Sequence, residues 1–322
     1  MRSLLSLLSL LALAAVLPQP CLFAQAQAPA NAAFQVPTTE DTSLLWRITP
    51  RSGAAPSYLF GTIHMIPKAD YFLDGSVVRA VNDVDAIFFE IDPREMQDPM
   101  AMMALMGKLT MRNDTTLEDL LRPSQYDSIA NYFTENGLPF FLFRNMKPMF
   151  LSAMVGQDMT TGNPFGGGEE TSGGMKSYEA ELTKVARAAD KEIGGLETMD
   201  FQVSIFDSIP YSVQAEMLYQ TIASEMNQEL EGGDGQLQQM VDMYKRRAVA
   251  EMSQLITSES EGYGNFEELL VTRRNQNWVP LILEFLESRP AMFAVGAGHL
   301  GGEHGVIALL RAEGISVEPV YD

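Results

Sequence analysis

Cysteine is almost absent from this chain. Its single cysteine, Cys21, lies in an N-terminal segment that fits a signal peptide rather than a folded core. A folded part without cysteine forms no disulfide, no thiolate zinc site and no thiol nucleophile. Gln19 and Pro20 make a poor lipoprotein processing site before Cys21, so lipidation there is not expected.

Basic residues are also scarce, with 22 Lys and Arg against 42 Asp and Glu and a formal net charge of −20. Such a surface repels nucleic acid and anionic lipid headgroups, so neither is an expected partner. It attracts cations, including metal ions. After the N-terminal segment, no stretch is long and apolar enough to predict a membrane span.

The N-terminus has the features of an export signal. Arg2 precedes an apolar run over residues 4–17, and Ala24-Gln25-Ala26 gives a small-x-small cleavage pattern. We expect a signal peptide over 1–26, a flexible tail over 27–43 and one domain over 44–322. An exported, cysteine-free chain fits the periplasm or the cell exterior.

The order of strands and helices predicts an α/β fold. Short apolar runs bounded by turn residues predict strands at both ends of the domain and one before residue 200. Helical patterns dominate between about 95 and 260. The expected architecture is a mixed sheet built from N- and C-terminal strands, flanked by helices, with a mostly helical central insertion. The predicted strands are 44–48, 58–63, 85–92, 192–197, 292–297 and 315–320.

A glycine-x-x-histidine pattern occurs twice, at Gly61-Thr62-Ile63-His64 and at Gly296-Ala297-Gly298-His299. Each copy follows a predicted buried strand, and open α/β sheets bind ligands beyond the carboxyl ends of their strands. The chain has only three histidines, so two matched positions are informative. A neutral imidazole there could bind a metal or act as a general base. The alternative is a histidine that only bonds a neighbouring carbonyl.

Two glutamates also end predicted strands. Glu90 follows an unbroken apolar run over 86–89, and Glu197 follows Leu196. A buried carboxylate is costly unless it is paired, protonated or bound to a cation. Glu90 could thus be a metal ligand or an acid/base partner of a bound water. Both could instead be solvated residues at the ends of strands.

One arginine near the C-terminal end points inward on a helical wheel. Arg274 falls among apolar residues, but Arg273 lies close enough that the wheel alone does not choose between them. An inward arginine needs an anion, either a buried carboxylate or a substrate oxyanion. His304, in the glycine-rich loop after His299, could join a metal site or lie on the surface.

Several catalytic motifs are missing. The glycine loop before the last predicted helix lacks the Lys-Ser/Thr of a P-loop and the spacing of a dinucleotide fingerprint. No G-x-S-x-G elbow of a serine hydrolase occurs either.

Taken together, these motifs resemble the TraB/GumN family. The matching elements are Phe60-Gly61-Thr62-Ile63-His64, the strand end at Glu90, Gly195-Leu196-Glu197-Thr198, Arg274-Asn275 and Val295-Gly296-Ala297-Gly298-His299-Leu300 with Gly302. They extend from about residue 44 to 321. The family pattern also favours Arg274 over Arg273. It has an acid near the start of the helix predicted over 177–191, a position that Glu179 could fill in this chain.

The resemblance implies an α/β fold similar to erythromycin esterases and haem-binding ChaN-type proteins. Its TIKI branch is described as metal-dependent proteases that use the two histidines and a glutamate. Carried over, the implied catalytic residues and metal ligands are His64, Glu90 and His299, with Arg274 as a further catalytic residue. Glu179, Glu197, Asn275 and His304 are additional candidates.

We therefore expect an exported hydrolase of peptide or ester bonds. A divalent ion such as Mn, Co or Zn would suit two imidazoles and a carboxylate, and Arg274 would stabilise an oxyanion. Two alternatives stay open: a metal-free hydrolase with one histidine as general base, and a non-catalytic protein that sequesters a peptide or haem. The sequence names neither the substrate nor the oligomeric state.

Overall fold

The computed structural model describes residues 36–95, 98–152, 154–155, 174–231, 236–260 and 266–322. The signal peptide predicted over 1–26 lies outside these residues, as does most of the tail predicted over 27–43. At the end of that tail, Ser43 is buried, and its hydroxyl donates to the carbonyls of Leu45 and Val320. The described fold therefore begins no later than Ser43.

A six-stranded sheet forms the centre of the fold, in the order β6-β4-β7-β2-β1-β8. Neighbours β6, β4, β7 and β2 run parallel, whereas β1 is antiparallel to both β2 and β8. The predicted mixed sheet is confirmed. Its strands are β1 (Leu45–Thr49), β2 (Ser57–Thr62), β4 (Ala86–Ile91), β6 (Glu192–Glu197), β7 (Ala291–Gly296) and β8 (Ser316–Pro319).

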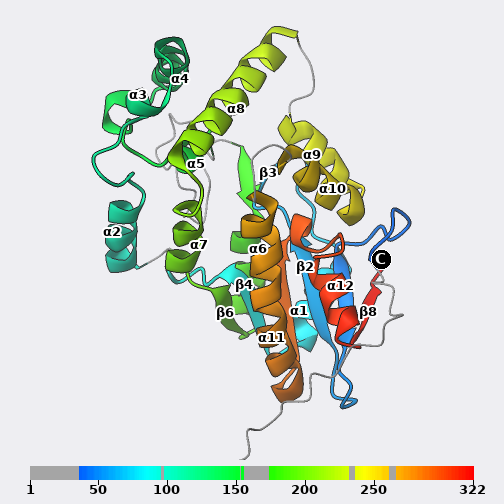
Figure 1. Cartoon of the computed structure of the whole chain (residues 1–322). Coiled ribbons are helices and arrows are strands. Elements are labelled where there is room, and N and C mark those ends of the chain that lie inside the picture. Colours follow the sequence, from blue (N-terminus) through cyan, green and yellow to red (C-terminus); the bar gives the residue numbers. More distant parts are fainter. Residues whose placement is uncertain (1–35, 96–97, 153, 156–173, 232–235, 261–265) are drawn as a thin grey trace, which may run out of the picture. The chain divides into compact units, whose positions relative to one another are not determined.

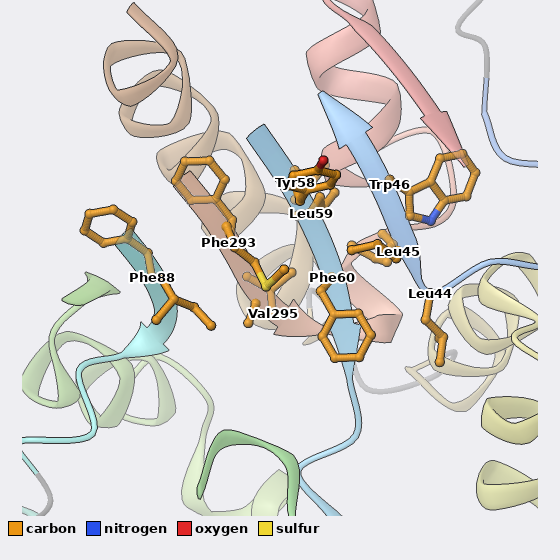
Figure 2. Packing of buried hydrophobic residues seen from close by; sticks show 14 of the residues in the cluster. Leu44, Leu45, Trp46, Tyr58, Leu59, Phe60, Phe88, Phe293 and Val295 are labelled. Carbon is orange, nitrogen blue, oxygen red and sulfur yellow. The ribbon is translucent and has the colours of Figure 1, made fainter. Parts of the chain in front are cut away.

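The central strands are apolar along nearly their whole length because helices cover both faces of the sheet. Phe88 of β4 packs against Phe293 of β7 with 5.8 Å between ring centroids. Figure 2 shows these rings and Trp46 of β1 beside the strands, and Phe60 of β2, which lies on the other face of the sheet and packs against Tyr178 with 6.2 Å between ring centroids. This packing fixes the strands whose ends carry the candidate site.

Helices α1 (Gly75–Asp83) and α6 (Tyr178–Ala188) pack together on one face, and α11 (Arg273–Ser288) and α12 (Val306–Ala312) on the other (Figure 1). The connections from β2 through α1 to β4 and from β4 to β6 both lead across the sheet toward its β6 edge. The connection from β6 through α11 back to β7 leads away from that edge. Since crossovers between parallel strands are right-handed, α11 lies on the opposite face.

The predicted helical insertion is divided into two parts, because α6 and β6 lie between them and belong to the central fold. The insertion consists of α2 (Pro99–Lys108), α3 (Leu117–Leu120), α4 (Pro123–Glu135), the 3₁₀ turn η2 (Phe140–Leu142), α5 (Pro148–Ser152), α7 (Met199–Phe206), α8 (Tyr211–Glu231), α9 (Gln236–Lys245) and α10 (Val249–Ser260). A second apolar cluster, which includes Phe133, Leu151 and Leu218, joins the helices α3, α4, α5 and α8 of the insertion. Helices α9 and α10 instead pack on the main core, through residues such as Tyr244 and Val249.

A small two-stranded sheet joins the first histidine motif to the start of α6. Strand β3 (Met65–Pro67) pairs antiparallel with β5 (Met175–Ser177), with Met65 opposite Ser177. Since His64 precedes β3 and Glu179 follows β5, this pairing brings their side chains together.

A π-helical segment, η4 (Glu268–Thr272), leads directly into α11. A wider π turn shifts the residues after it around the helix axis, so a regular wheel loses its phase there. Arg274 and Asn275 are both buried, while Arg273 is exposed. Pro280 lies inside α11 without ending it.

Candidate active site at the carboxyl edge of the sheet

Four parallel strands bring chemically active residues to one edge of the sheet. β2 ends at Thr62, β6 ends at Glu197 and β7 ends at Gly296, while Glu90 lies one residue before the end of β4. Parallel strands end at the same edge, which is where open α/β sheets bind ligands. The two histidine motifs follow adjacent strands, since Thr62 pairs with Gly296.

Arg274 is the centre of the buried part of the site. Its Nη2 donates to Oε2 of Glu90 and to Oε1 of Glu197, the latter at 2.6 Å, and its Nε donates to Oε1 of Glu197 at 2.9 Å. Its Nη1 donates to the carbonyl of Leu270 at 3.2 Å and lies 3.1 Å from Nε2 of His299. These contacts engage all five N–H donors of the guanidinium. An oxyanion could bind Arg274 only if one of these partners were released.

Glu90 faces α11 because it lies two residues after Phe88, whose ring packs on Phe285 of that helix at 4.1 Å. Its Oε1 accepts the backbone N–H of Gly296 at 2.7 Å. Burial opposes ionisation of Glu90, but Arg274 outweighs it and holds the pKa of this carboxyl well below its ordinary range. Glu90 is therefore a carboxylate with both oxygens bonded.

Glu197 shares the guanidinium with Glu90. It also accepts a hydrogen bond from the indole N–H of Trp278 at 3.0 Å, and Gln202 donates to both carboxylates at 3.2–3.3 Å. Burial raises the pKa of Glu197, so it is the less acidic member of the pair. Two buried acids thus share one cation, while the backbone N–H of Gly296 and the indole N–H of Trp278 satisfy their other oxygens.

His299 belongs to the same buried cluster, next to Arg274, and 10% of its side chain is exposed. Its Nδ1 donates to Oδ1 of Asn275 at 2.7 Å, and its ring lies 4.6 Å from that of Trp278. Asn275 Nδ2 also donates to the carbonyls of His299 and His304, which fixes the loop that carries both histidines. Burial lowers the pKa of His299 to about 3. The ring is therefore neutral, with its proton on Nδ1 and its lone pair on Nε2 facing Arg274.

His64 has the opposite surroundings, with 67% of its side chain exposed. Its Nδ1 bonds Oε1 of Glu179 at 2.9 Å, and the same oxygen accepts the hydroxyl of Thr62 at 2.9 Å. The negative charge of Glu179 raises the pKa of His64 to about 9. A carboxylate on Nδ1 fixes the orientation of the ring and leaves Nε2 for contact with a ligand.

Gly296 is the point at which the two halves of the site meet. A methyl group added at its α-carbon would lie 3.2 Å from Oε1 of Glu90, 3.5 Å from the His299 ring and 4.0 Å from Nε2 of His64. A side chain at Gly296 would therefore press on Glu90, whereas it would make only ordinary contacts with the two histidines. His299 Nε2 still lies 3.9 Å from the nearer oxygen of Glu90.

The donor set matches a divalent metal in chemical type, but its arrangement does not fit one. Both histidines have an oxygen partner on Nδ1, which is common for metal ligands. However, the lone pair of His299 Nε2 already accepts an N–H of Arg274, and both Glu90 oxygens accept hydrogen bonds. Among the described residues, no group of three or more His, Cys, Asp or Glu side chains is placed to hold a metal ion.

The structure brings most of the predicted site residues together. Glu90, Glu197, Arg274, Asn275 and His299 form the buried cluster, and His64 and Glu179 form an exposed pair beside it. His304 takes part only through its backbone carbonyl, and its ring is exposed.

Three contributors were missed by sequence reasoning. Trp278 lies one helical turn after Arg274, so the spacing pointed to a shared face. Thr62 lies inside the first histidine motif. Gln202 had only a weak signal, as a polar residue within the mostly apolar helix α7.

A separate cavity of about 310 Å³ lies between α1, the start of β1 and the end of α9, and it contains none of these residues. The candidate site instead lies at the carboxyl edge of the sheet, where His64 is exposed and the cluster around Arg274 is buried. Among the described residues, no helix is both long and apolar enough to cross a membrane.

Comparisons with known proteins identify the family of this chain. A model of the TraB/PrgY/gumN family matches residues 44–319. The chain belongs to the TraB/PrgY/gumN family. The match covers every strand and helix that contributes to the site, and it confirms the resemblance seen in the sequence motifs.

Curated relatives at low identity are named as metalloproteases. The chain is 23% identical to metalloprotease TIKI2 of Danio rerio, over 86% of this chain and 60% of that protein. It is 22% identical to metalloprotease TIKI1 of Danio rerio and 24% identical to that of Homo sapiens, each over 90% of this chain. The aligned part spans 65% and 64% of those two relatives. No solved structure matches the chain.

Proposed function

We propose that this chain is an exported hydrolase of peptide or ester bonds, with His64 as its general base. The observation that carries the proposal is the His64–Glu179 pair, which lies exposed at the sheet edge, next to the buried charge cluster. The names of the TIKI relatives support hydrolysis and favour a peptide substrate. The export signal expected over residues 1–26 supports the location.

In this mechanism each residue has a defined task. Glu179 orients His64 through Nδ1, and Nε2 accepts a proton from a water molecule that attacks the scissile carbonyl. The protonated ring then returns this proton to the leaving amine or alkoxide as the scissile C–N or C–O bond breaks. Glu90, Arg274 and His299 form the buried part of the site, and Glu90 fixes the position of Gly296 by accepting its backbone N–H. Because the pKa of His64 is about 9, only a small fraction of the ring is unprotonated at neutral pH.

The metal-dependent form of this function has Mn, Co or Zn bound by His64, Glu90 and His299. It requires Arg274 to release the Nε2 atom of His299, and the metal content of untagged protein tests it. The proposed reaction uses only groups of the chain itself.

The test is hydrolysis of a panel of internally quenched peptides and chromogenic esters by the wild type and by His64→Gln. We expect kcat/KM to fall by about 10²–10⁴ in the variant. In the wild type kcat/KM should rise with pH up to about 9. Equal rates in the two proteins would contradict the role of His64. Binding of the panel without turnover in either protein would favour a sequestering protein instead.

A further inference from the structure

The guanidinium of Arg274 lies where the buried ligands of a metal ion would have to converge. Its Nη2 donates to Oε2 of Glu90, and its Nη1 lies 3.1 Å from Nε2 of His299. Both residues are ligands that the family resemblance implies. In this chain the positive charge next to them belongs to a side chain.

The geometry makes the arginine and a metal mutually exclusive at His299. The Nδ1–H of the neutral ring donates to Oδ1 of Asn275, so one lone pair remains, on Nε2. A metal would use that lone pair at about 2.0–2.1 Å, and the N–H of Arg274 already uses it. Glu90 is also a poor ligand for a metal, because both of its oxygens are occupied. Oε1 accepts the backbone N–H of Gly296, and Oε2 accepts hydrogen bonds from Arg274 and Gln202.

Arg274 is also held firmly in this position. Glu197 accepts from two of its nitrogens, and the carbonyl of Leu270 accepts from a third. Its guanidinium lies 4.8 Å from the ring centroid of Trp278, within the range of a cation–π contact. Its side chain is 7% exposed, so movement out of the cluster would leave two buried carboxylates without a cation.

We propose that Arg274 is the internal cation of this site, and that its guanidinium keeps divalent metal ions away from Glu90 and His299. The wild-type chain then needs no metal at its buried ligands, and loss of the guanidinium turns the same residues into a metal site. Metal binding at these residues does not depend on turnover, so metal titration tests the proposal even if the chain hydrolyses no substrate.

The test is metal binding by untagged protein. Manganese, cobalt and zinc are titrated calorimetrically into the wild type and Arg274→Met, with Arg273→Met as the matched control because that arginine is exposed. We expect no metal bound through His299 in the wild type or the control. Arg274→Met should bind about one equivalent of metal, at least about tenfold more tightly than the wild type binds any metal. A second change in this variant, His299→Ala, should remove that binding.

Two results would overturn the proposal. One is a metal in the wild type that His299→Ala abolishes, and the other is a folded Arg274→Met protein that gains no site. If Arg274→Met does not fold, ¹⁵N-histidine spectra of the wild type decide the question, because the chain has only three histidines. Stoichiometric Zn²⁺ should leave the ring-nitrogen shifts of His299 at those of a neutral, metal-free imidazole, and a metal-bound shift at its Nε2 would refute the inference.

Discussion

The two histidine motifs occupy equivalent places in the fold and give their histidines opposite properties. His64 and His299 follow adjacent parallel strands at the same edge of the sheet. His64 is 67% exposed and has a pKa of about 9, whereas His299 is 10% exposed and has a pKa of about 3. The motif delivers an imidazole to the edge, and its partners decide what that imidazole can do.

The partners come from different parts of the chain. Glu179, from the start of α6, makes His64 a basic, accessible group. Burial keeps His299 neutral, and Asn275 and Arg274, from α11, bond its two ring nitrogens. Under the proposed function the first motif transfers protons and the second supports the structure, and four measurements test this difference.

The largest effect is expected from removal of the cation on the His299 side. Arg274→Met leaves Glu90 and Glu197 buried without a counterion, which should lower the free energy of unfolding by about 3–5 kcal/mol. Urea denaturation measures this change. Arg273→Met is the control and should change stability by less than about 0.5 kcal/mol. A similar, small change in both proteins would mean that the buried cluster does not hold the fold together.

The next effect separates the two histidines directly. His299→Ala removes a buried ring from Trp278 and leaves Asn275 with an unpaired acceptor, at an expected cost of about 1–3 kcal/mol. His64→Ala should stay within about 0.5 kcal/mol of the wild type because its ring is mostly exposed. Urea midpoints of the two variants give the comparison, and equal losses would contradict it.

A third measurement tests the cause of the pKa difference. In ¹⁵N-histidine spectra, His64 should titrate near pH 9 and His299 only near pH 3. Glu179→Gln removes the negative charge beside His64, so the pKa of His64 should fall toward its ordinary value of 6.5. His299 should not respond to this change. A pKa that stays near 9 in the variant would show that another group holds the proton.

The smallest effect is the pH dependence of stability from the His64–Glu179 pair. Its raised pKa means that the stabilising charge on His64 is complete below pH 6.5 and is lost as the pH rises through about 9. Exposure screens the pair, so the loss should be below about 1 kcal/mol. Urea midpoints at pH 6.5 and just above pH 9 should therefore differ slightly more in the wild type than in Glu179→Gln. The reverse order would contradict the sign.

Much of the sheet edge could be predicted from the sequence, because its signals are local. Apolar runs that end in glycine or glutamate identify β2, β4 and β7 and the residues just beyond them. Parallel strands end together, so His64, Glu90 and His299 could be placed near one another before the structure was known.

The parts that could not be predicted depend on long-range pairing or on irregular geometry. No local pattern shows that β3 and β5 pair and bring Glu179 to His64. The π segment at Glu268–Thr272 shifts the helical phase, so a regular wheel could not choose between Arg273 and Arg274. The full occupation of the five Arg274 donors likewise depends on four partner residues from four separate segments.

The position of β7 has a consequence for how the protein acquires its shape. This strand comes late in the chain, yet it lies between β2 and β4, so the two early strands have no common neighbour until it arrives. Contacts between such distant segments form slowly, and open strand edges invite aggregation in the meantime. A nascent chain that ended before Ala291 would carry His64 and Glu90 on an incomplete sheet. Completion of the fold and assembly of the site are therefore one late event.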